Sequence, residues 1–326
     1  MDSRLRGNDR GCIGCIMIKY QFRASEKLSA FLLLLTLGII WGTGYSIARF
    51  ATTNGVPPLG YSFWQALGPA ILISLLCKTQ NSRLKISVPH LRYYFIAGLT
   101  GIVIPNTNMY LAAPHLPAGI LAVVVNIVPV IAYPLALYNR TESFNVLRLC
   151  GVFSAMAGLL LILLPKTSLP SPDMIPWVVS SLVTPLSFAF CAVYIARHRP
   201  DHSDSLSLSA STLIAASMVL LPFVLVLHHF YTPHFPLTLP DFVILLEIVL
   251  SSIGYILFFQ LIKIAGPVYY SLVDTIVSLT GLVWGYLIFG EKLNTWTAPA
   301  VVLIFFALLL VTSQQRTSAF FTGAKT

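Results

Sequence analysis

Long apolar stretches separated by short polar connections dominate the hydrophobic pattern of this chain. About 20 mostly apolar residues are needed for a helix to cross the hydrocarbon core of a membrane, and ten stretches reach that length. They lie at roughly 28–50, 58–77, 93–112, 117–138, 146–164, 175–196, 206–227, 241–262, 267–290 and 295–313. Because these runs do not alternate as barrel strands do, the pattern predicts an all-α membrane protein with ten transmembrane helices.

The same pattern occurs twice along the chain. Glu142 matches Glu291 and Asn145 matches Asn294, each pair 149 residues apart and without a gap. Five spans fall in each copy, and an odd number of spans places the two copies in opposite orientations. We therefore expect two inverted five-helix repeats, an arrangement found in secondary transporters.

The repeats define the expected domain organisation. The first repeat covers residues 28–165 and the second covers residues 174–314, with a cytoplasmic tail at 315–326. Residues 1–27 form a cytoplasmic leader, and its first 16 residues are polar and lack a helical period, so we expect the native chain to begin at Met17. The Cys12–Cys15 spacing resembles a redox or metal pair, but its place in this leader argues against a working thiol pair.

The charged residues support one orientation of the spans. The chain is 56% hydrophobic and 10% charged, with a formal net charge of +9. With the N-terminus in the cytoplasm, 17 of the 20 Lys and Arg residues fall on the cytoplasmic side, which is the positive-inside bias. This segregation predicts a multi-pass protein of a bacterial inner membrane with both termini in the cytoplasm. It also explains the positive charge without a nucleic-acid partner.

Polar and aromatic side chains recur at helical spacing in spans one, three, four, six, eight and nine. A polar side chain in hydrocarbon is costly, so it usually faces the interior of the bundle. These six spans, three from each half, are therefore expected to line a cavity, with the third span broken at Pro105. The candidate solute-binding residues are Trp41, Tyr45, Asn106, Asn108, Tyr110, Asn126, Tyr194, Tyr255, Tyr270, Asp274 and Ser278.

Three charged residues are candidates for gating or coupling. Arg49 lies near the outer end of the first span, where it could also snorkel to the interface. Glu247 is either a partner for Arg49 or an ordinary interfacial carboxylate. Asp274 is about eight residues, or ~12 Å, from the cytoplasmic end of the ninth span, on the same face as Tyr270 and Ser278. We expect Asp274 to face a cavity or a partner, and a structural hydrogen-bonded Asp is the alternative.

Two other groups of polar residues have plainer interpretations. Ser180, Thr184 and Ser187 follow one face of the sixth span, where small hydroxyl residues commonly serve helix packing. Three His residues lie in the Pro-rich segment 228–241, which we interpret as a polar interfacial loop rather than a metal site. No metal ion or cofactor is expected.

Several of these features resemble the drug/metabolite transporter superfamily, in its EamA-type branch. The resemblance covers about residues 28–314 and rests on Ile40-Trp41-Gly42, the Pro-containing fourth span, Gly290-Glu291-Lys292-Leu293 and the duplicated layout. The chain departs from the family pattern at Asn139-Arg-Thr-Glu142, which lacks a Gly before Glu, and at Ser278, where Pro is frequent. The resemblance implies a central cavity lined by the same six spans, and solutes that include amino acids, other metabolites, nucleobases or drugs, usually moved outward.

The leading interpretation is a secondary transporter that exports small amphipathic or amino-acid-like metabolites by alternating access. The chain has no Walker-type Gly-rich loop, so counter-flow of a proton or a solute would drive it rather than ATP. The alternatives are an intramembrane enzyme and a non-transporting receptor or scaffold. An enzyme would need a catalytic group of residues within the spans, whereas all seven His residues lie outside the hydrophobic centres.

Overall fold

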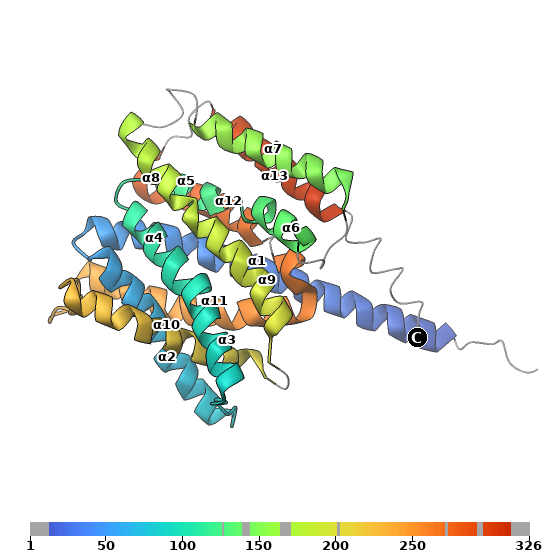
Figure 1. Ribbon diagram of the computed structural model, residues 1–326, viewed down its shortest axis with the longest axis horizontal. Coiled ribbons are helices and arrows are strands. Elements are labelled where there is room, and N and C mark those ends of the chain that lie inside the picture. Colours follow the sequence, from blue (N-terminus) through green and yellow to red (C-terminus); the bar gives the residue numbers. More distant parts are fainter. Residues whose placement is uncertain are drawn as a thin grey trace, which may run out of the picture.

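The computed structural model describes residues 13–125, 127–138, 144–163, 171–200, 203–270, 273–291 and 296–313, and all regular structure in them is helical. Figure 1 shows the helices packed as a bundle. In chain order the elements are α1 (Ile13–Thr53), α2 (Pro58–Thr79), α3 (Val88–Gly98), the π-helix η1 (Leu99–Val103), α4 (Ile104–Ala112), α5 (Ala118–Val125), α6 (Val128–Tyr138), α7 (Val146–Leu163), the 3-10 helix η2 (Pro172–Met174), α8 (Ile175–Ser181), α9 (Val183–His198), α10 (Ser205–Val226), α11 (Leu239–Tyr270), α12 (Val273–Phe289) and α13 (Thr297–Ser313).

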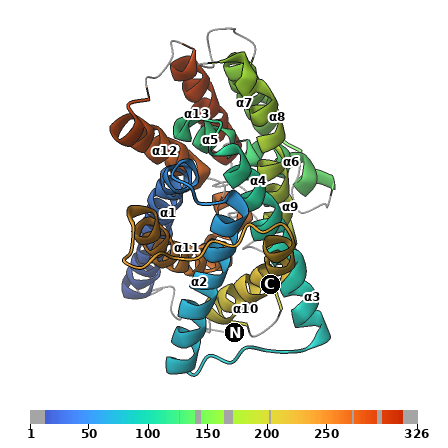
Figure 2. The ribbon, with the colours of Figure 1, turned by 90° about the vertical axis from the view of Figure 1, so that its left-hand side faces the viewer.

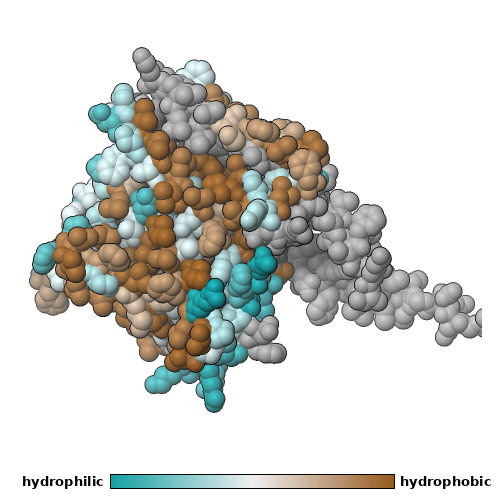
Figure 3. Space-filling view, in the orientation of Figure 1, coloured by the Kyte–Doolittle hydropathy of each residue, from teal (hydrophilic) through white to brown (hydrophobic). Residues whose placement is uncertain are grey.

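Six helical segments of the described chain are long and apolar enough to cross a membrane. They are Leu28–Thr53, Pro58–Thr79, Ala118–Leu135, Pro172–Ile195, Ser205–Val226 and Leu239–Ile264. These segments correspond to predicted spans one, two, four, six, seven and eight. Shorter or less apolar helices occupy the other four predicted positions, so the count of ten spans stays a prediction. Figure 3 shows apolar side chains over most of one face, with hydrophilic residues gathered at its lower edge.

Two helix boundaries differ from the prediction. Helix α1 begins at Ile13, well before the first predicted span, and α11 extends to Tyr270, where the ninth span was expected to have begun. Hydropathy marks where a helix leaves the apolar layer, whereas a helix ends where its backbone hydrogen bonding ends. Tyr270 is the last described residue of α11, and Asp274 and Ser278 belong to α12. Residues 271 and 272 lie outside the described residues, so the expectation that these three side chains share one helix stays a prediction.

The third span passes through Pro105 without a break. Helices α3, η1 and α4 follow one another directly, and the π-helical turn lies immediately before Pro105. The hydroxyl of Ser187 donates to the carbonyl of Thr100 (2.6 Å), and that of Thr184 donates to the carbonyl of Pro105 (2.9 Å). Carbonyls at a distorted helical turn need other partners, and α9 supplies them. The hydroxyl face of α9 therefore fixes the third span in place.

Helix α1 packs between α11 and α12 (Figure 2). Small residues allow α1 and α12 to approach closely, because a Cβ atom at Gly42 would lie 2.6 Å from Cβ of Thr280. Helices α7 and α13 lie side by side at one edge of the bundle (Figure 1), where Ser154 Oγ donates to the carbonyl of Leu303 (3.0 Å). The helices around α1 are thus the ones that can enclose a central site.

One end of the bundle, which we call the Arg199 end, joins the connection after α2 to the connection after α9. Ser82 Oγ donates to Asp204 Oδ2 (2.6 Å), and Arg199 Nη1 donates to the carbonyl of Phe259 (3.1 Å). Partial burial raises the pKa of Asp204, but hydrogen bonds from Ser82 and Ser207 outweigh burial and hold that pKa below its usual value. Asp204 is therefore charged at neutral pH and caps the first turn of α10.

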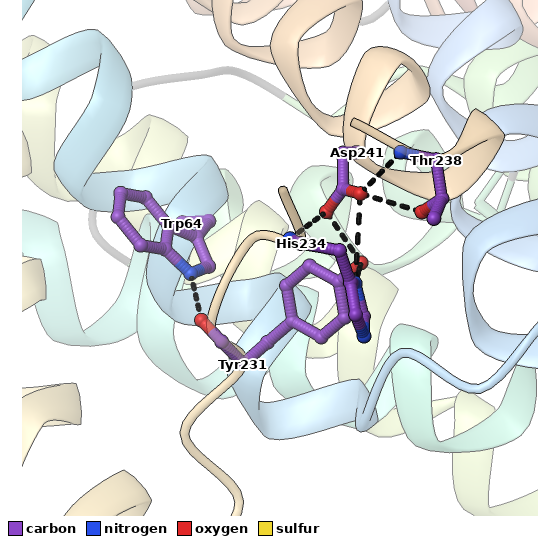
Figure 4. Close-up of polar contacts among 5 residues, drawn as sticks. All are labelled: Trp64, Tyr231, His234, Thr238 and Asp241. Carbon is purple, nitrogen blue, oxygen red and sulfur yellow. Dashed lines mark hydrogen bonds and ion pairs between the residues drawn. The ribbon is translucent and has the colours of Figure 1, made fainter. Parts of the chain in front are cut away.

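The opposite end of the bundle contains the end of α1, the start of α2 and Glu291 after α12, and we call it the Glu291 end. The Pro-rich loop between α10 and α11 lies there against α2 (Figure 4). Asp241 accepts hydrogen bonds from the hydroxyl of Tyr231 (2.7 Å) and from the backbone N–H of Thr238 (2.7 Å). Trp64 Nε1 on α2 donates to the carbonyl of Tyr231 (2.8 Å). These bonds hold the loop against α2. In the described part of the chain, no three His, Cys, Asp or Glu residues lie close enough to hold a metal ion.

Candidate functional site

A cavity of about 60 Å³ lies between helices from both halves of the chain. It is smaller than the cavity of roughly 150 Å³ that accommodates benzene in a protein core, so a solute larger than a few atoms requires its walls to move apart. Helices α1, α2, η1, α4 and α5 contribute from the first half, and α9, α11 and α12 from the second. The walls are mainly aromatic and polar, and consist of Trp41, Gly44, Tyr45, Gln65, Gly101, Asn106, Tyr110, Val125, Phe188, Cys191, Glu247, Tyr255, Phe258, Tyr270, Asp274 and Val277.

Helix α1 presents one face to the cavity. Trp41 and Tyr45 are one turn apart, so both side chains project from the same side of the helix. Gly44 lies beside them and has no side chain to occupy the space in front of Glu247. A Cβ atom at Gly44 would lie 3.4 Å from Glu247 Oε1, at ordinary contact distance. The glycine therefore keeps the carboxylate of Glu247 accessible from the cavity.

A network of buried hydrogen bonds forms one wall. Gln65 Nε2 donates to Ser251 Oγ (3.0 Å), and Ser251 Oγ donates to Glu247 Oε1 (2.7 Å). On its other side, Gln65 Oε1 accepts from Asn106 Nδ2 (2.9 Å), which also lies 3.1 Å from the hydroxyl of Tyr255. Buried polar groups need such partners, and a connected network fixes the orientation of each member. Gln65 thus links α2 to both α4 and α11.

Aromatic rings around Trp41 form a second part of the cavity wall, and Tyr255 belongs to both parts. The ring centroid of Trp41 lies 5.5 Å from that of Phe258, 6.0 Å from that of Tyr270 and 6.3 Å from that of Tyr255. Phe258 and Tyr270 also contact each other, with centroids 4.9 Å apart. Edge-to-face pairs at these separations are favourable. We call these four residues the aromatic box.

Two carboxylates line the cavity with unpartnered oxygens. Asp274 is 2% exposed and Glu247 is 5% exposed. Asp274 Oδ2 and Glu247 Oε2 have no hydrogen-bond partner among the described residues. Asp274 is the second described residue of α12, and residues 271 and 272 before that helix lie outside the described residues. Unpaired buried carboxylates are costly, which marks them as candidates for a functional role.

The cavity brings together most of the residues singled out from the sequence, namely Trp41, Tyr45, Asn106, Tyr110, Glu247, Tyr255, Tyr270 and Asp274. Three others have different surroundings. Asn108 Oδ1 accepts from Thr184 Oγ1 (3.2 Å), Tyr194 stacks on Tyr93 with centroids 5.8 Å apart, and Ser278 Oγ donates to the carbonyl of Ala122 (2.8 Å). Asn126, the remaining candidate, lies outside the described residues.

Arg49 pairs with Glu291 at the Glu291 end. Pairing with Glu247 was one of the two interpretations that the sequence left open, and Glu247 instead lines the cavity. The guanidinium of Arg49 also lies over the ring of Phe289, 4.5 Å from its centroid. Glu291 accepts hydrogen bonds from the backbone N–H groups of Ala118 (2.9 Å) and Gly119 (3.1 Å) at the start of α5. Glu291 thus ties together α1, α5 and the end of α12, and we call this set of contacts the Glu291 clasp.

Sequence reasoning missed several lining residues, of which Gln65 is the most important. The other polar groups of span two are small hydroxyls such as Ser62 and Ser74 and the aromatic residues Tyr61 and Trp64, so the sequence analysis treated the span as poor in polar groups. The amide of Gln65 was itself a signal, because such a group within a membrane span is expected to face the bundle interior. The other missed residues are Gly44, Gly101, Val125, Phe188, Cys191, Phe258 and Val277, which are small or apolar and do not differ in type from ordinary core residues.

Apolar helices that can cross a membrane, together with a buried polar cavity between two halves of the chain, define a multi-pass integral membrane protein with a central site. Residues 28–164 and 175–313 each match the model of the EamA-like transporter family. The chain belongs to the EamA-like transporter family, which confirms the resemblance inferred from its sequence. This membership indicates a membrane transporter of small solutes.

Two known proteins illustrate the similarity. The chain is 28% identical over 285 residues to Protein PecM of Dickeya dadantii (strain 3937), covering 83% of this chain and 88% of that protein. A solved crystal structure aligns with a TM-score of 0.61 at 15% identity, covering 88% of this chain and 98% of its own. The second likeness shows that the fold is shared.

Proposed function

We propose that this protein is a secondary transporter that exports small amphipathic or amino-acid-like metabolites by alternating access. The observation that carries the proposal is the central cavity, which both halves of the chain line and in which two buried carboxylates keep unpartnered oxygens. A solute site at the interface of two repeats is the usual arrangement in such carriers. A receptor or an intramembrane enzyme remains the alternative class that the experiment below tests.

Two contacts support an arrangement of two inverted five-helix repeats related by a two-fold axis. Asn106 Nδ2 contacts the hydroxyl of Tyr255, and Ser154 Oγ contacts the carbonyl of Leu303. Each pair is separated by 149 residues, the same offset that relates the two copies in the sequence. Equivalent positions of two related copies can touch only beside the axis that relates them. The first of these contacts lies in the wall of the cavity, which supports a cavity on the axis.

The distribution of charge supports the orientation of the protein in a bacterial inner membrane. Cationic residues gather around the Arg199 end of the described chain, and they include Lys78, Arg83, Lys85, Arg92, Arg197 and Arg199. By the positive-inside rule this end faces the cytoplasm, as do both termini. The Glu291 end then faces outward, where the Glu291 clasp and the Pro-rich loop close it. Arg49 is the proposed gating residue of that end.

Counter-flow of a proton or a solute supplies the driving force in this proposal. Asp274 and Glu247 are the proposed coupling residues, because they are the buried carboxylates of the cavity. The candidate solute-contacting residues are those of the cavity wall, and Asn126 remains a candidate from sequence alone. Export is the proposed direction, as the family resemblance implies.

The experiment is counter-flow in vesicles that contain the purified protein. Vesicles loaded with an unlabelled amino acid, amine or nucleobase should accumulate the same labelled compound more than protein-free vesicles do. Trp41→Ala should reduce this uptake at least tenfold, because it removes the centre of the aromatic box. Trp296→Ala is the matched control, since Trp296 is 42% exposed and lies away from the cavity. Equal losses for both variants, or no uptake of any compound, would count against the proposal.

A further inference from the structure

We propose that the cavity selects an organic ammonium cation, meaning a solute with a flat apolar body and a positive nitrogen but no carboxylate. Asp274 would pair with the nitrogen, and rings of the aromatic box would lie against it. The inference names the substrate class of the proposed transport site and rests on that function, because only a carrier needs to admit and release such a solute. It keeps the amphipathic solute of the proposed function and excludes the amino-acid-like one.

The charge of the cavity is the first argument. Two carboxylates line it, and none of the described residues in its wall is Lys, Arg or His. Arg49 of α1, which follows Tyr45 by one turn, is paired with Glu291 and does not line the cavity. A solute carboxylate would therefore meet like charges without a cationic partner, which is unfavourable in a buried site. A positive group would instead complement Asp274.

The hydrogen-bonding state of the wall is the second argument. The side-chain amides that could donate to a solute carboxylate are already used, since Gln65 Nε2 donates to Ser251 and Asn106 Nδ2 donates to Gln65. The unpartnered groups are acceptors, namely Asp274 Oδ2 and Glu247 Oε2. A site whose side-chain amides are occupied and whose two carboxylate acceptors are open favours a positively charged solute over an anion.

The aromatic box is the third argument. Trp41 lies within 6.3 Å of Tyr255, Phe258 and Tyr270, measured between ring centroids. The negative faces of such rings attract cations, and Trp is the strongest of the three ring types in this respect. Aromatic rings and a buried carboxylate around one cavity form the combination that recognises alkylammonium groups. Glu247 lies against Gly44 and also lines the cavity, so it adds negative potential there.

The test uses two permanently charged probes that differ by one carboxylate. These are phenethyltrimethylammonium and N,N,N-trimethylphenylalanine, neither of which loses its positive charge by deprotonation. Binding to the full-length protein in lipid nanodiscs is measured by calorimetry, and counter-flow is measured in vesicles. The ammonium should bind at least tenfold more tightly than the zwitterion. Asp274→Asn should weaken ammonium binding at least tenfold, and Asp274→Glu should retain the preference.

Each outcome decides between the two proposals. Equal or tighter binding of the zwitterion overturns the ammonium inference, and counter-flow of that zwitterion leaves the transport proposal standing. Ammonium binding that depends on Asp274, without counter-flow of the bound probe, supports the site and overturns transport. If neither the ammonium nor the zwitterion binds, the inference is overturned. If Asp274→Asn does not fold, the affinity ratio of the unchanged protein still decides.

Discussion

At the scale of single residues, helical spacing predicted much of the cavity wall. Trp41 and Tyr45 form a stripe on one helix, and both line the cavity. Gln65 could not be found in this way, because its hydrogen-bond partners Asn106 and Ser251 come from other helices. Spacing along one helix shows which residues share a face. It does not show which isolated residue on a neighbouring helix completes a network.

We predict that Gln65→Leu destabilises the protein by about 1–3 kcal/mol, because it leaves buried partners without a hydrogen bond. It should also slow transport, since Asn106 and Ser251 lose the group that orients them. The measurement is the unfolding midpoint in detergent, together with counter-flow. Gln80→Leu is the control, because Gln80 is exposed at the end of α2 and should change neither quantity. Similar midpoints for both variants would show that the network contributes little.

At the scale of helices, the third span shows why a sequence signal for a break was wrong. A proline inside a helix commonly ends or kinks it. Around Pro105, however, Ser187 and Thr184 of α9 donate to the carbonyls of Thr100 and Pro105. The sequence showed both Pro105 and the hydroxyl residues of α9, but nothing in it indicated that the third span and α9 face each other. The interpretation of the hydroxyl face of α9 as a packing surface agrees with these bonds.

The crossing of α1 and α12 depends on the absence of a side chain at one position. A Cβ atom at Gly42 would lie 2.6 Å from Cβ of Thr280, whereas one at Gly44 would have no neighbour closer than 3.4 Å. Gly42→Ala should therefore destabilise the protein by about 1–3 kcal/mol through overpacking. Gly44→Ala is the matched control on the same helix and should leave the unfolding midpoint nearly unchanged. Equal shifts in thermal unfolding would contradict a close crossing at Gly42.

At the scale of the whole molecule, hydropathy predicted an all-helical membrane protein and the duplication predicted its two family matches. The sequence assigned each connection to one side of the membrane, but it could not show which connections touch each other there. That information comes from contacts between distant segments, such as Ser82 with Asp204 at the Arg199 end. Nor could it show that Arg49 meets Glu291, because the two residues are brought together only by the packing of α1 against α12.

Orientation is testable at this scale by thiol labelling. In a variant without the five native cysteines, Phe235→Cys should react in intact cells with a membrane-impermeant reagent, because Phe235 is 99% exposed at the Glu291 end. Asn81→Cys, at the Arg199 end, should react only after the cells are opened. Reaction of Asn81→Cys alone in intact cells would reverse the proposed orientation.

The contact between Asn106 and Tyr255 has a consequence for how the two halves diverged. Two identical copies facing each other across an axis would carry every acidic residue twice. In the fused chain, the positions 149 residues before Glu247 and Asp274 are Gly98 and Val125. Both buried acids therefore belong to the second half alone. In the proposed two-fold arrangement, the cavity therefore takes both of its acids from one half, which an assembly of two identical subunits could not do.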